Sequence, residues 1–499
     1  MKKLYVILVL LCMSSIASAQ VWTWDTLVND NNPTLALVRD HQHNVYSFGK
    51  GGHVLTKYSR WGSLLLQKSF PAEMKIRKIA FDNSNDLYIL AGFNDTITVE
   101  SQTIINNNQD DILILKYAQD GTFKWLTTIF GEGSDYAGDI CFDQGGLLLV
   151  TGETSGNTNF SSVVVNKPPH RDLFIARYDT SGNYLQSFFS VFIDETNALY
   201  QSGSAAGIEI ELDQNNDIVL FSSVNGKYQI DTLIIDAEAA GYVIKLDSNF
   251  HLQWAKFTGG TYAKDMDDML INADNDIIYN INNIWHTGHD GWIRKVSENG
   301  VTLSTLIHVS GGYITGIDAD GSGDLYYAAG RSEKDNNSGV PRPDFMIYSR
   351  ITSSGVPVWE KIDSSYSTMR GEDITADGNE VFVSGYYSDT IHLFNDYTSG
   401  YGKFLAIIEN SPLIGVAEPG PVSGFSIYPN PSTGRFTVQH GIFRGKAQLC
   451  VYDLAGNCVY SGELSGEHTV IDLSGKAKGL YFIEVSAGTE KTRGKLILD

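Results

Sequence analysis

The segment Asp82-Asn-Ser-Asn-Asp-Leu-Tyr-Ile-Leu-Ala-Gly92 is one copy of a motif that recurs along most of this 499-residue chain. It joins a turn rich in Asp and Asn to a short apolar strand that ends in Gly. Further copies begin at Asp143, Asp213, Asp274, Asp320 and Asp377, and a degenerate copy spans Asp40–Gly49. A motif that returns at a nearly constant spacing indicates a repeat architecture.

A second motif follows the first. It is an apolar strand that ends in a basic residue, as in Asp111-Ile-Leu-Ile-Leu-Lys-Tyr117. The basic residues, separated by 59, 61, 68, 50 and 55 positions, are Lys57, Lys116, Arg177, Lys245, Lys295 and Arg350. A Trp lies nine residues after three of them, at Trp125, Trp254 and Trp359. The last copy, Phe404–Glu409, has no base.

Each repeat therefore contains four predicted strands: one before the Asp turn, one after it, one that ends in the base and one that carries the Trp. The first strands are predicted at residues 76–81, 137–142, 207–212 and 314–319. Short runs rich in Val, Ile, Tyr and Phe between turns favour strands over helices. Four short strands in about 60 residues are typical of a propeller blade. We predict an all-β chain with a seven-bladed β-propeller over residues 20–410; an eight-bladed ring or two sandwiches are the alternatives.

The N-terminal segment offers a strand that could close the ring. Val21–Leu27 resembles the Trp strand Phe123–Ile129, whereas the seventh repeat stops at Glu409 without a Trp strand of its own. Pairing the first strand with the last repeat removes two open sheet edges, which otherwise template aggregation. We predict this pairing.

Together the two motifs resemble the SBBP and delta-60 type repeats of bacterial secreted propellers. The resemblance covers roughly residues 21–410. It implies a fold and no particular ligand, because propellers carry many functions.

Residues 1–19 have the pattern of a secretory signal peptide. Lys2 and Lys3 precede the apolar run Leu4–Met13, and Ala17-Ser-Ala19 precedes Gln20. The run is too short to span a bilayer, which needs about 20 apolar residues. We predict cleavage between Ala19 and Gln20, with Sec-dependent export to the periplasm.

The C-terminal region is predicted to be a separate domain. Residues 411–424 hold Pro412, Pro419 and Pro421 and are expected to be a linker. Residues 20–410 carry 26 basic and 50 acidic side chains, net −24, whereas residues 421–499 carry 8 and 7, net +1. Because a change of composition beside a linker marks a domain boundary, we predict a small β-sandwich of about seven strands over residues 425–499.

This tail resembles the type A C-terminal sorting domain of Bacteroidetes type IX secretion cargo. The resemblance is carried, in order, by Tyr428, Pro429, Asn430, Pro431, Gly434, Phe436, Gly456, Gly479, Tyr481 and Lys495. It implies recognition by the outer-membrane translocon and removal of the tail by a sortase-like peptidase. Release of the protein, or attachment to surface lipopolysaccharide, would follow. A sandwich module for binding is the alternative.

Composition excludes some classes of function. The net charge of −22 repels phosphate backbones, so we predict no nucleic-acid partner. Four Cys are too few for a disulfide-stapled miniprotein. Cys450 and Cys458 lie on paired predicted strands, but the register places their side chains on opposite faces unless a bulge intervenes, which disfavours a disulfide.

The loops that join consecutive repeats carry Gly with Tyr, and such loops gather on one face of a propeller. Tyr rings are flat apolar platforms with a hydroxyl, which suit sugars or peptides. The candidate ligand-binding residues are Tyr136, Tyr200, Tyr262, Tyr313 and Tyr366. The alternative is that each Tyr packs between neighbouring blades.

A metal or catalytic centre has little support. Asp318, Asp320 and Asp324 resemble a calcium loop, but other repeats hold Asn, Ser or Gln there, so turn formation is the stronger interpretation. The pairs His41/His43 and His286/His289 have no third ligand at a recognised spacing. Motifs for a metalloprotease, a nucleophile elbow or a phosphate loop are missing, so we assign no catalytic residue and no cofactor.

These features predict a secreted or surface-displayed propeller, exported by type IX secretion, that binds a glycan or a protein without catalysis. A polysaccharide hydrolase or lyase, and a structural surface component, are the alternatives. A close pair of carboxylates at the mouth of the channel would favour the enzyme.

Overall fold

The computed structural model describes residues 22–28, 35–106, 109–161, 163–168, 170–193, 203–258, 268–285, 288–332, 344–365, 368–377, 380–388, 391–393, 396–398, 402–409, 425–428, 432–440, 447–453, 457–464, 468–487 and 490–498. The regular secondary structure in these ranges consists of β-strands, so the predicted all-β class is confirmed. The same ranges contain no helix that could cross a membrane. The chain divides into two compact units, one of Gln20–Ser411 and one that contains Pro412–Asp499.

Among the described residues, the larger unit contains antiparallel sets of four strands, which we number in chain order as blades 1 to 7. The sets are: β2 (Leu35–Arg39), β3 (Val45–Gly49), β4 (Val54–Tyr58) and β5 (Leu64–Ser69); β6 (Met74–Phe81), β7 (Leu87–Phe93), β10 (Asp111–Tyr117) and β11 (Phe123–Gly131); β12 (Tyr136–Phe142), β13 (Leu148–Ser155), β16 (Arg171–Tyr178) and β17 (Tyr184–Phe189); β19 (Ser204–Leu212), β20 (Ile218–Ile230), β21 (Leu233–Leu246) and β22 (Leu252–Phe257); β23 (Met269–Ile271), β24 (Ile277–Trp285), β25 (Gly288–Val296) and β26 (Thr302–Ser310); β27 (Gly312–Ala319), β28 (Leu325–Ser332), β29 (Asp344–Ile351) and β30 (Pro357–Ser365); β31 (Met369–Asp377), β32 (Glu380–Tyr387), β35 (Gly402–Glu409) and β1 (Trp22–Val28).

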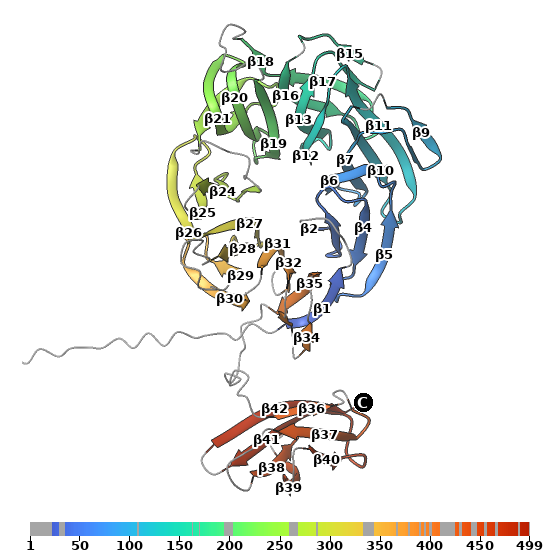
Figure 1. Ribbon diagram of the computed structural model, residues 1–499, viewed down its shortest axis with the longest axis vertical. Helices are drawn as coiled ribbons and strands as arrows, with labels where there is room; N and C mark the ends of the chain where they lie inside the picture. The colour runs from blue at the N-terminus through green and yellow to red at the C-terminus, as the bar shows by residue number, and fades with distance from the viewer. Residues whose placement is uncertain are drawn as a thin grey trace, which may run out of the picture. The chain divides into compact units, whose positions relative to one another are not determined.

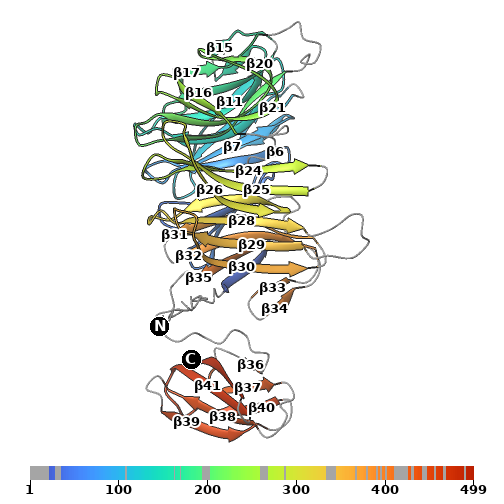
Figure 2. The same ribbon diagram turned by 90° about the vertical axis from the view of Figure 1, so that its left-hand side faces the viewer.

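These sheets form a ring. Figure 1 shows β2, β6, β12, β19, β27 and β31, the first strands of their blades, facing the axis. In the edge-on view of Figure 2, strands such as β25, β28 and β29 run along that axis. A ring of four-stranded antiparallel sheets with this strand order is a β-propeller, which confirms the predicted fold.

The ring is closed by pairing between the first strand of the chain, β1, and the last strand of the larger unit, β35. β1 pairs antiparallel with β35, with Asp25 opposite Ala406 and Leu27 opposite Phe404. The predicted pairing of the N-terminal strand with the last repeat is therefore confirmed. This pairing gives blade 7 its fourth strand.

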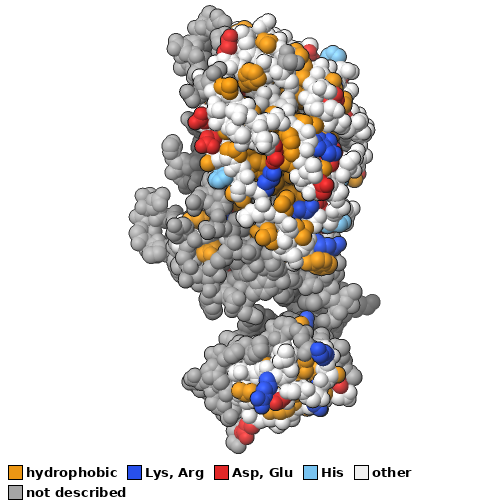
Figure 3. Space-filling view, turned by 90° about the vertical axis from the view of Figure 1, so that its right-hand side faces the viewer, with side chains coloured by type: hydrophobic (Ala, Val, Ile, Leu, Met, Phe, Trp, Pro, Cys, Tyr) orange, Lys and Arg blue, Asp and Glu red, His pale blue; other side chains and the backbone are white. Residues whose placement is uncertain are grey.

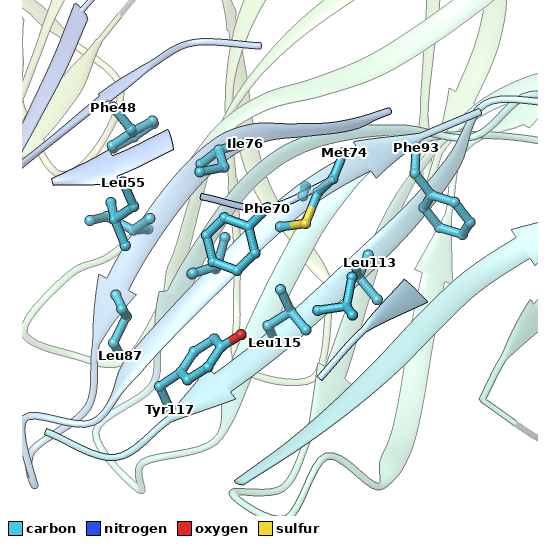
Figure 4. Packing of buried hydrophobic residues seen from close by; sticks show 14 of the residues in the cluster. Phe48, Leu55, Phe70, Met74, Ile76, Leu87, Phe93, Leu113, Leu115 and Tyr117 are labelled. Carbon is cyan, nitrogen blue, oxygen red and sulfur yellow. The ribbon is translucent and has the colours of Figure 1, made fainter. Parts of the chain in front are cut away.

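The middle strands of the blades are buried on both faces, because neighbouring blades cover them. All seven residues of β10 are buried. In Figure 4, Phe48 and Leu55 of blade 1 and Leu113 of blade 2 belong to one apolar cluster between the two blades. Burial on both faces explains why these strands appear in the sequence as continuous apolar runs rather than as alternating ones.

The two sequence motifs meet inside each blade. Asp213 Oδ1 accepts the backbone N–H groups of Asn215 and Asp217, which closes the turn. Its Oδ2 lies 2.7 Å from Nζ of Lys245, the base that ends the third strand. Corresponding ion pairs join Lys57 to Asp40, Lys116 to Asp82, Arg177 to Asp143, Lys295 to Asp276 and Arg350 to Asp320 and Asp324.

One repeat boundary was predicted wrongly. The fifth Asp turn was placed at Asp274, but Oδ1 of Asn272 accepts the N–H groups of Asp274 and Asp276. The motif therefore begins two residues earlier, with Asn in the place of Asp. Asn closes this kind of turn as Asp does, because its side-chain oxygen accepts the same bonds.

Two of the Trp strands contact the following blade. Trp125 Nε1 donates to the carbonyl of Thr180, and Trp254 Nε1 donates to that of Glu298. Gly182, two residues after Thr180, has a φ of +82°, and a Cβ there would lie 2.9 Å from the Trp125 ring. Gly182, in the turn that follows the third strand of blade 3, therefore allows both a left-handed turn and close packing of Trp125.

Hairpins between second and third strands add further contacts. β14 (Thr158–Phe160) and β15 (Val163–Val165) belong to blade 3, but β14 pairs with β11 of blade 2. The other short strands are β8 (Ile97–Val99), β9 (Gln102–Ile104), β18 (Val191–Phe192), β33 (Ile391–Leu393) and β34 (Asp396–Thr398).

The smaller unit has two sheets around one core. Its strands are β36 (Phe425–Tyr428), β37 (Arg435–His440) and β40 (His468–Asp472) in one sheet, and β39 (Cys458–Glu463), β38 (Ala447–Tyr452), β41 (Gly479–Ala487) and β42 (Glu490–Leu498) in the other. Phe436, Val451 and Leu496 are among the buried residues between them. Two packed antiparallel sheets form a small β-sandwich.

Candidate functional site

Charged side chains lie on the innermost strands, or directly before one in blade 5, four positions before the first residue of the Asp or Asn turn. We call this set the central cluster; it consists of Lys78, Asp139, Glu209, Asp268 and Asp373. In β6, β12, β19 and β31 the pairing register shifts at or next to this position. A bulge re-aims a side chain, which explains a charged residue in an otherwise apolar strand.

Three members of the central cluster contact one another across blades 2, 3 and 4. Nζ of Lys78 lies 2.8 Å from Oε2 of Glu209 and 3.5 Å from Oδ1 of Asp139. Burial and the neighbouring Asp139 raise the pKa of Glu209 well above its usual range. Burial lowers the pKa of Lys78, but Asp139 and Glu209 outweigh it and hold that pKa well above the ordinary value. The ammonium group of Lys78 therefore lies beside two carboxyl groups, those of Asp139 and Glu209.

The Asp members of the cluster also bind the backbone of the following blade. Asp139 Oδ2 accepts from Ile210 N at 3.0 Å, and Asp268 Oδ2 accepts from Ile317 N at 3.1 Å. Asp373 Oδ2 accepts from Leu37 N at 2.8 Å, across the junction between blades 7 and 1. These carboxylates therefore join blades 3 to 4, 5 to 6 and 7 to 1.

Burial also raises carboxyl pKa values in the cluster and next to it. Burial raises the pKa of Asp373 to about 7, and the pKa of Glu211, two residues after Glu209, to about 8. A protonated carboxyl group beside an ionised one is the usual equipment of general acid–base catalysis. Among the described residues, however, a pocket of ≈ 420 Å³ lies at the turns of blade 2, lined by Ser84, Asp86, Ala118, Gln119 and Asp120, and does not include the cluster.

The central cluster was not predicted from the sequence. Its members come from different repeats, and Lys78, Asp139 and Glu209 fall inside runs that were predicted as first strands. The available signal was a charged residue at one fixed position before the Asp turn, in five of the repeats.

Two of the five predicted Tyr residues lie in the described part of the chain. Tyr136 is half-buried at the start of β12, and the guanidinium of Arg171 lies 5.1 Å from the centre of its ring. Arg171 also pairs with Glu153. Tyr313 is half-buried and lies against Gly330. Burial lowers the pKa of Arg370 in blade 7, but Tyr313 and Glu372 outweigh burial, so that this pKa is raised. Tyr200, Tyr262 and Tyr366 lie outside the described residues.

The three Asp residues of the calcium-like loop face protein donors. Asp320 Oδ1 accepts from the N–H groups of Ser322 and Asp324, and its Oδ2 accepts from the Tyr326 hydroxyl. Asp324 pairs with Arg350 at 2.8 Å. Asp318 Oδ2 accepts from the N–H of Ala376 in blade 7. No three His, Cys, Asp or Glu side chains of the described residues are grouped to hold a metal ion.

On the side of the larger unit seen in Figure 3, acidic and basic side chains are scattered among apolar and other polar ones. Charge of one sign is therefore not gathered into a single patch on that side.

In the smaller unit, several motif residues serve the sandwich itself. Phe436 and Tyr481 are buried in the core. Gly434 has a φ of +120°, and a Cβ there would lie 2.6 Å from Ser474 Cα, so only Gly fits. Gly479 also has a positive φ, +140°. Lys495 is exposed on β42, opposite Phe482, of which 43% is exposed.

The other residues predicted for the signal peptide and the tail are described only in part. Tyr428 pairs through its backbone with Thr437. Ala19, Gln20, Pro429, Asn430, Pro431 and Gly456 lie outside the described residues. Cys450 is opposite Ser461 and Cys458 opposite Tyr452, with a register shift between Val451 and Tyr452, and both thiols are free.

Known proteins resemble each unit separately. Residues 426–499 match the family model described as the secretion system C-terminal sorting domain. No curated protein sequence matches the chain. Among solved structures, virginiamycin B lyase from Staphylococcus aureus is 9% identical with a TM-score of 0.40, covering 77% of this chain and 98% of its own. The WD40 domain of Neurospora crassa Pan2 is 8% identical with a TM-score of 0.45, covering 79% and 96%.

The likeness to these solved structures is too distant to bear on a ligand or an activity. The match to the sorting domain is specific, and it falls on the unit where the predicted motif residues build the sandwich core. A C-terminal sorting domain directs its carrier through the secretion machinery to the cell surface or the medium. The chain is therefore a β-propeller that carries the C-terminal sorting domain of a type IX secretion cargo.

Proposed function

We propose that the propeller is a non-catalytic module that binds a glycan or a protein outside the cell. The supporting observation is the hydrogen bonding of the central cluster, where Asp139, Asp268 and Asp373 accept backbone N–H groups of the next blade. A carboxylate held in this way joins two blades, and a change in its protonation would loosen the ring. The carboxylates on the inner strands are thus better suited to rigidity than to turnover.

The proposed binding surface is the face of the ring that carries Tyr136. Its half-buried ring with the guanidinium of Arg171 at 5.1 Å combines an apolar platform with fixed donors. Sugar hydroxyls and peptide carbonyls suit such a surface, because ring faces pack on C–H groups while Arg donates hydrogen bonds. Tyr200, Tyr262 and Tyr366 remain proposed contributors to the same face.

The test is a glycan and protein array probed with the mature chain. We expect one ligand class to be retained, with at least about tenfold weaker binding after Tyr136→Ala, the equivalent of about 1.4 kcal/mol. Tyr313→Phe is the matched control, because Tyr313 packs against blade 7. Binding that is unaffected by Tyr136→Ala would contradict the assignment of this face.

A polysaccharide-cleaving enzyme is the second candidate. It is favoured by the coupled Lys78, Asp139 and Glu209 groups and by the raised pKa of Glu211. Release of reducing sugar or unsaturated ends by the wild-type chain, lost in both Glu209→Gln and Glu211→Gln, would replace the binding proposal with this one.

For export, we propose that a Sec leader is removed before Gln20 and that a sortase-like peptidase removes the tail after translocation. The match of residues 426–499 to the sorting domain supports this order. Mass spectrometry of surface or secreted material should find chains that begin at Gln20 and lack the tail. Recovery of surface chains that still end at Asp499 would contradict tail removal.

A further inference from the structure

Two buried carboxylates between blades 2 and 3 each have one oxygen without a partner. Asp111 and Asp135 are 6% and 1% exposed. Asp111 Oδ2 accepts from Asn106 Nδ2 at 2.8 Å, and Asp135 Oδ1 accepts from Ser155 N at 2.9 Å. Among the described residues, Asp111 Oδ1 and Asp135 Oδ2 have no hydrogen-bond partner. Such a buried oxygen normally has one, because leaving it unpaired costs about 1–3 kcal/mol or more.

Both carboxyl groups lie beside Gly131, the last residue of β11. Asp135 Oδ2 is 3.5 Å from the position that a Cβ of Gly131 would take, and the Asn157 carbonyl oxygen is closer still. The N–H of Gly131 also acts on the carboxyl group of Asp111. Carboxylate and carbonyl oxygens therefore lie against Gly131, where the Asn157 carbonyl leaves no room for a side chain.

The repeat provides an internal comparison for this site. In blade 3 the residue equivalent to Asp111 is Asp172, since each lies in the first two residues of its third strand, opposite the end of the second. Five residues before Asp172, Nζ of Lys167 lies 2.9 Å from Asp172 Oδ2 and also donates to the carbonyls of Thr154 and His170. A lysine thus supplies the positive charge that a buried carboxylate requires.

In blade 2 the equivalent of Lys167 is Asn106. Its Nδ2 donates to Gln109 O and Asp111 Oδ2, with Phe93 O at 3.5 Å, so it takes the place of the ammonium group atom for atom. An amide carries no charge. Blade 2 therefore keeps the acceptors of the blade 3 site, adds Asp135, and lacks the cation.

Blade 2 therefore leaves Asp111 without the ammonium group that Lys167 gives to Asp172. The ammonium group of Lys167 itself is held by three acceptors of blade 3.

We propose that Asp111 and Asp135 bind a calcium ion between blades 2 and 3. The donors are all oxygens, which suits a hard cation, and Ca²⁺ completes a shell of 6–8 ligands with backbone carbonyls and water. Bound there, the ion links the third strand of blade 2 to the segment that enters blade 3.

The test is thermal unfolding of the mature full chain in CaCl₂ and in EDTA at matched ionic strength, with calorimetric titration of Ca²⁺. We expect Ca²⁺ to raise Tm by about 2–5 °C at concentrations well above its Kd. Asp135→Asn should abolish the shift. Asn106→Lys, which installs the blade 3 lysine, should raise Tm in EDTA and remove the response to Ca²⁺.

Asn106→Lys keeps the test informative even if Asp135→Asn does not fold. A wild-type chain with neither a calorimetric signal nor a Tm shift in Ca²⁺ would overturn the proposal and leave the pair as two carboxyls that share protons. A Ca²⁺ response that persists in Asn106→Lys would overturn the location.

Discussion

Removing the ammonium group of Lys245 should destabilise the propeller strongly. Its side chain is 4% exposed, and Nζ lies 2.7 Å from Asp213 Oδ2 and 3.3 Å from Asp217 Oδ2. The Asp213 side chain is 1% exposed, and its other oxygen already accepts two backbone N–H groups. Lys245→Met keeps the aliphatic packing but leaves the Asp213 charge buried.

The expected loss in the free energy of unfolding is about 3–5 kcal/mol, the usual cost of removing one partner of a buried ion pair. Adding Asp213→Asn to Lys245→Met should recover part of it, because the uncompensated charge is then gone. Lys124→Met is the control. Lys124 is 42% exposed, and its partner Asp86 keeps Lys116 at 3.1 Å, so the loss should be about 0–1 kcal/mol.

Urea unfolding followed by Trp fluorescence measures these differences. All eight Trp residues precede residue 360, so the signal reports the propeller and not the sorting domain. A loss below about 1 kcal/mol for Lys245→Met, with an unchanged m-value, would refute the view that these ion pairs stabilise each blade internally. So would a double variant no more stable than Lys245→Met.

Four other outcomes are expected. Gly182→Ala should lower the free energy of unfolding more than Gly121→Ala does. Both Gly residues have φ above +80°, but only Gly182 contacts Trp125. Equal losses of stability in urea unfolding would exclude a role for that contact. Burial and Asp268 raise the pKa of Asp373 to about 7, so the folded protein holds this proton more tightly than the unfolded chain does. The stability of the wild type should therefore fall as the pH rises from about 4 to 7. The fall should be smaller in Asp373→Asn, which a series of Tm measurements against pH would show. Phe436→Ala should lower the free energy of unfolding of the sandwich by about 3–5 kcal/mol, because Phe436 is buried in its core. Circular dichroism of the full chain would follow the unfolding transition of the sandwich, and a transition that does not shift would contradict the prediction. Deleting residues 424–499 should leave the propeller in the periplasm, as cell fractionation would show; normal surface delivery would rule out the sorting role.

The propeller could be predicted from the sequence because its signals are local and repeated. Asp82, Asp213 and Asp320 each close a turn within four residues, and the base that pairs with them ends a strand at a regular distance. Asn272 was misread because the prediction looked for Asp, whereas the turn needs only a side-chain oxygen.

The contacts between blades could not be predicted in the same way. Asp139 reaches Ile210, and Lys78 reaches Glu209, over separations of 71 and 131 residues. Such pairs depend on a bulge in each inner strand, and a bulge leaves no motif in the sequence. Tyr136 and Tyr313 were predicted as one class, yet the first contacts Arg171 of its own blade and the second acts on Arg370 of the next blade.

The distribution of polar residues separates structure from function in this chain. Polar residues shared by most repeats, such as Asp213 with Lys245, or Asp373 with Leu37 N, are used to close turns and to join blades. A ligand site therefore has to come from positions where one blade departs from the others. Asn106, where the next blade has Lys167, is such a departure, and it gives the buried Asp111 an amide partner where Asp172 has an ammonium group. Changing Asn106 to Lys should consequently alter ligand binding while it preserves, or increases, the stability of the ring.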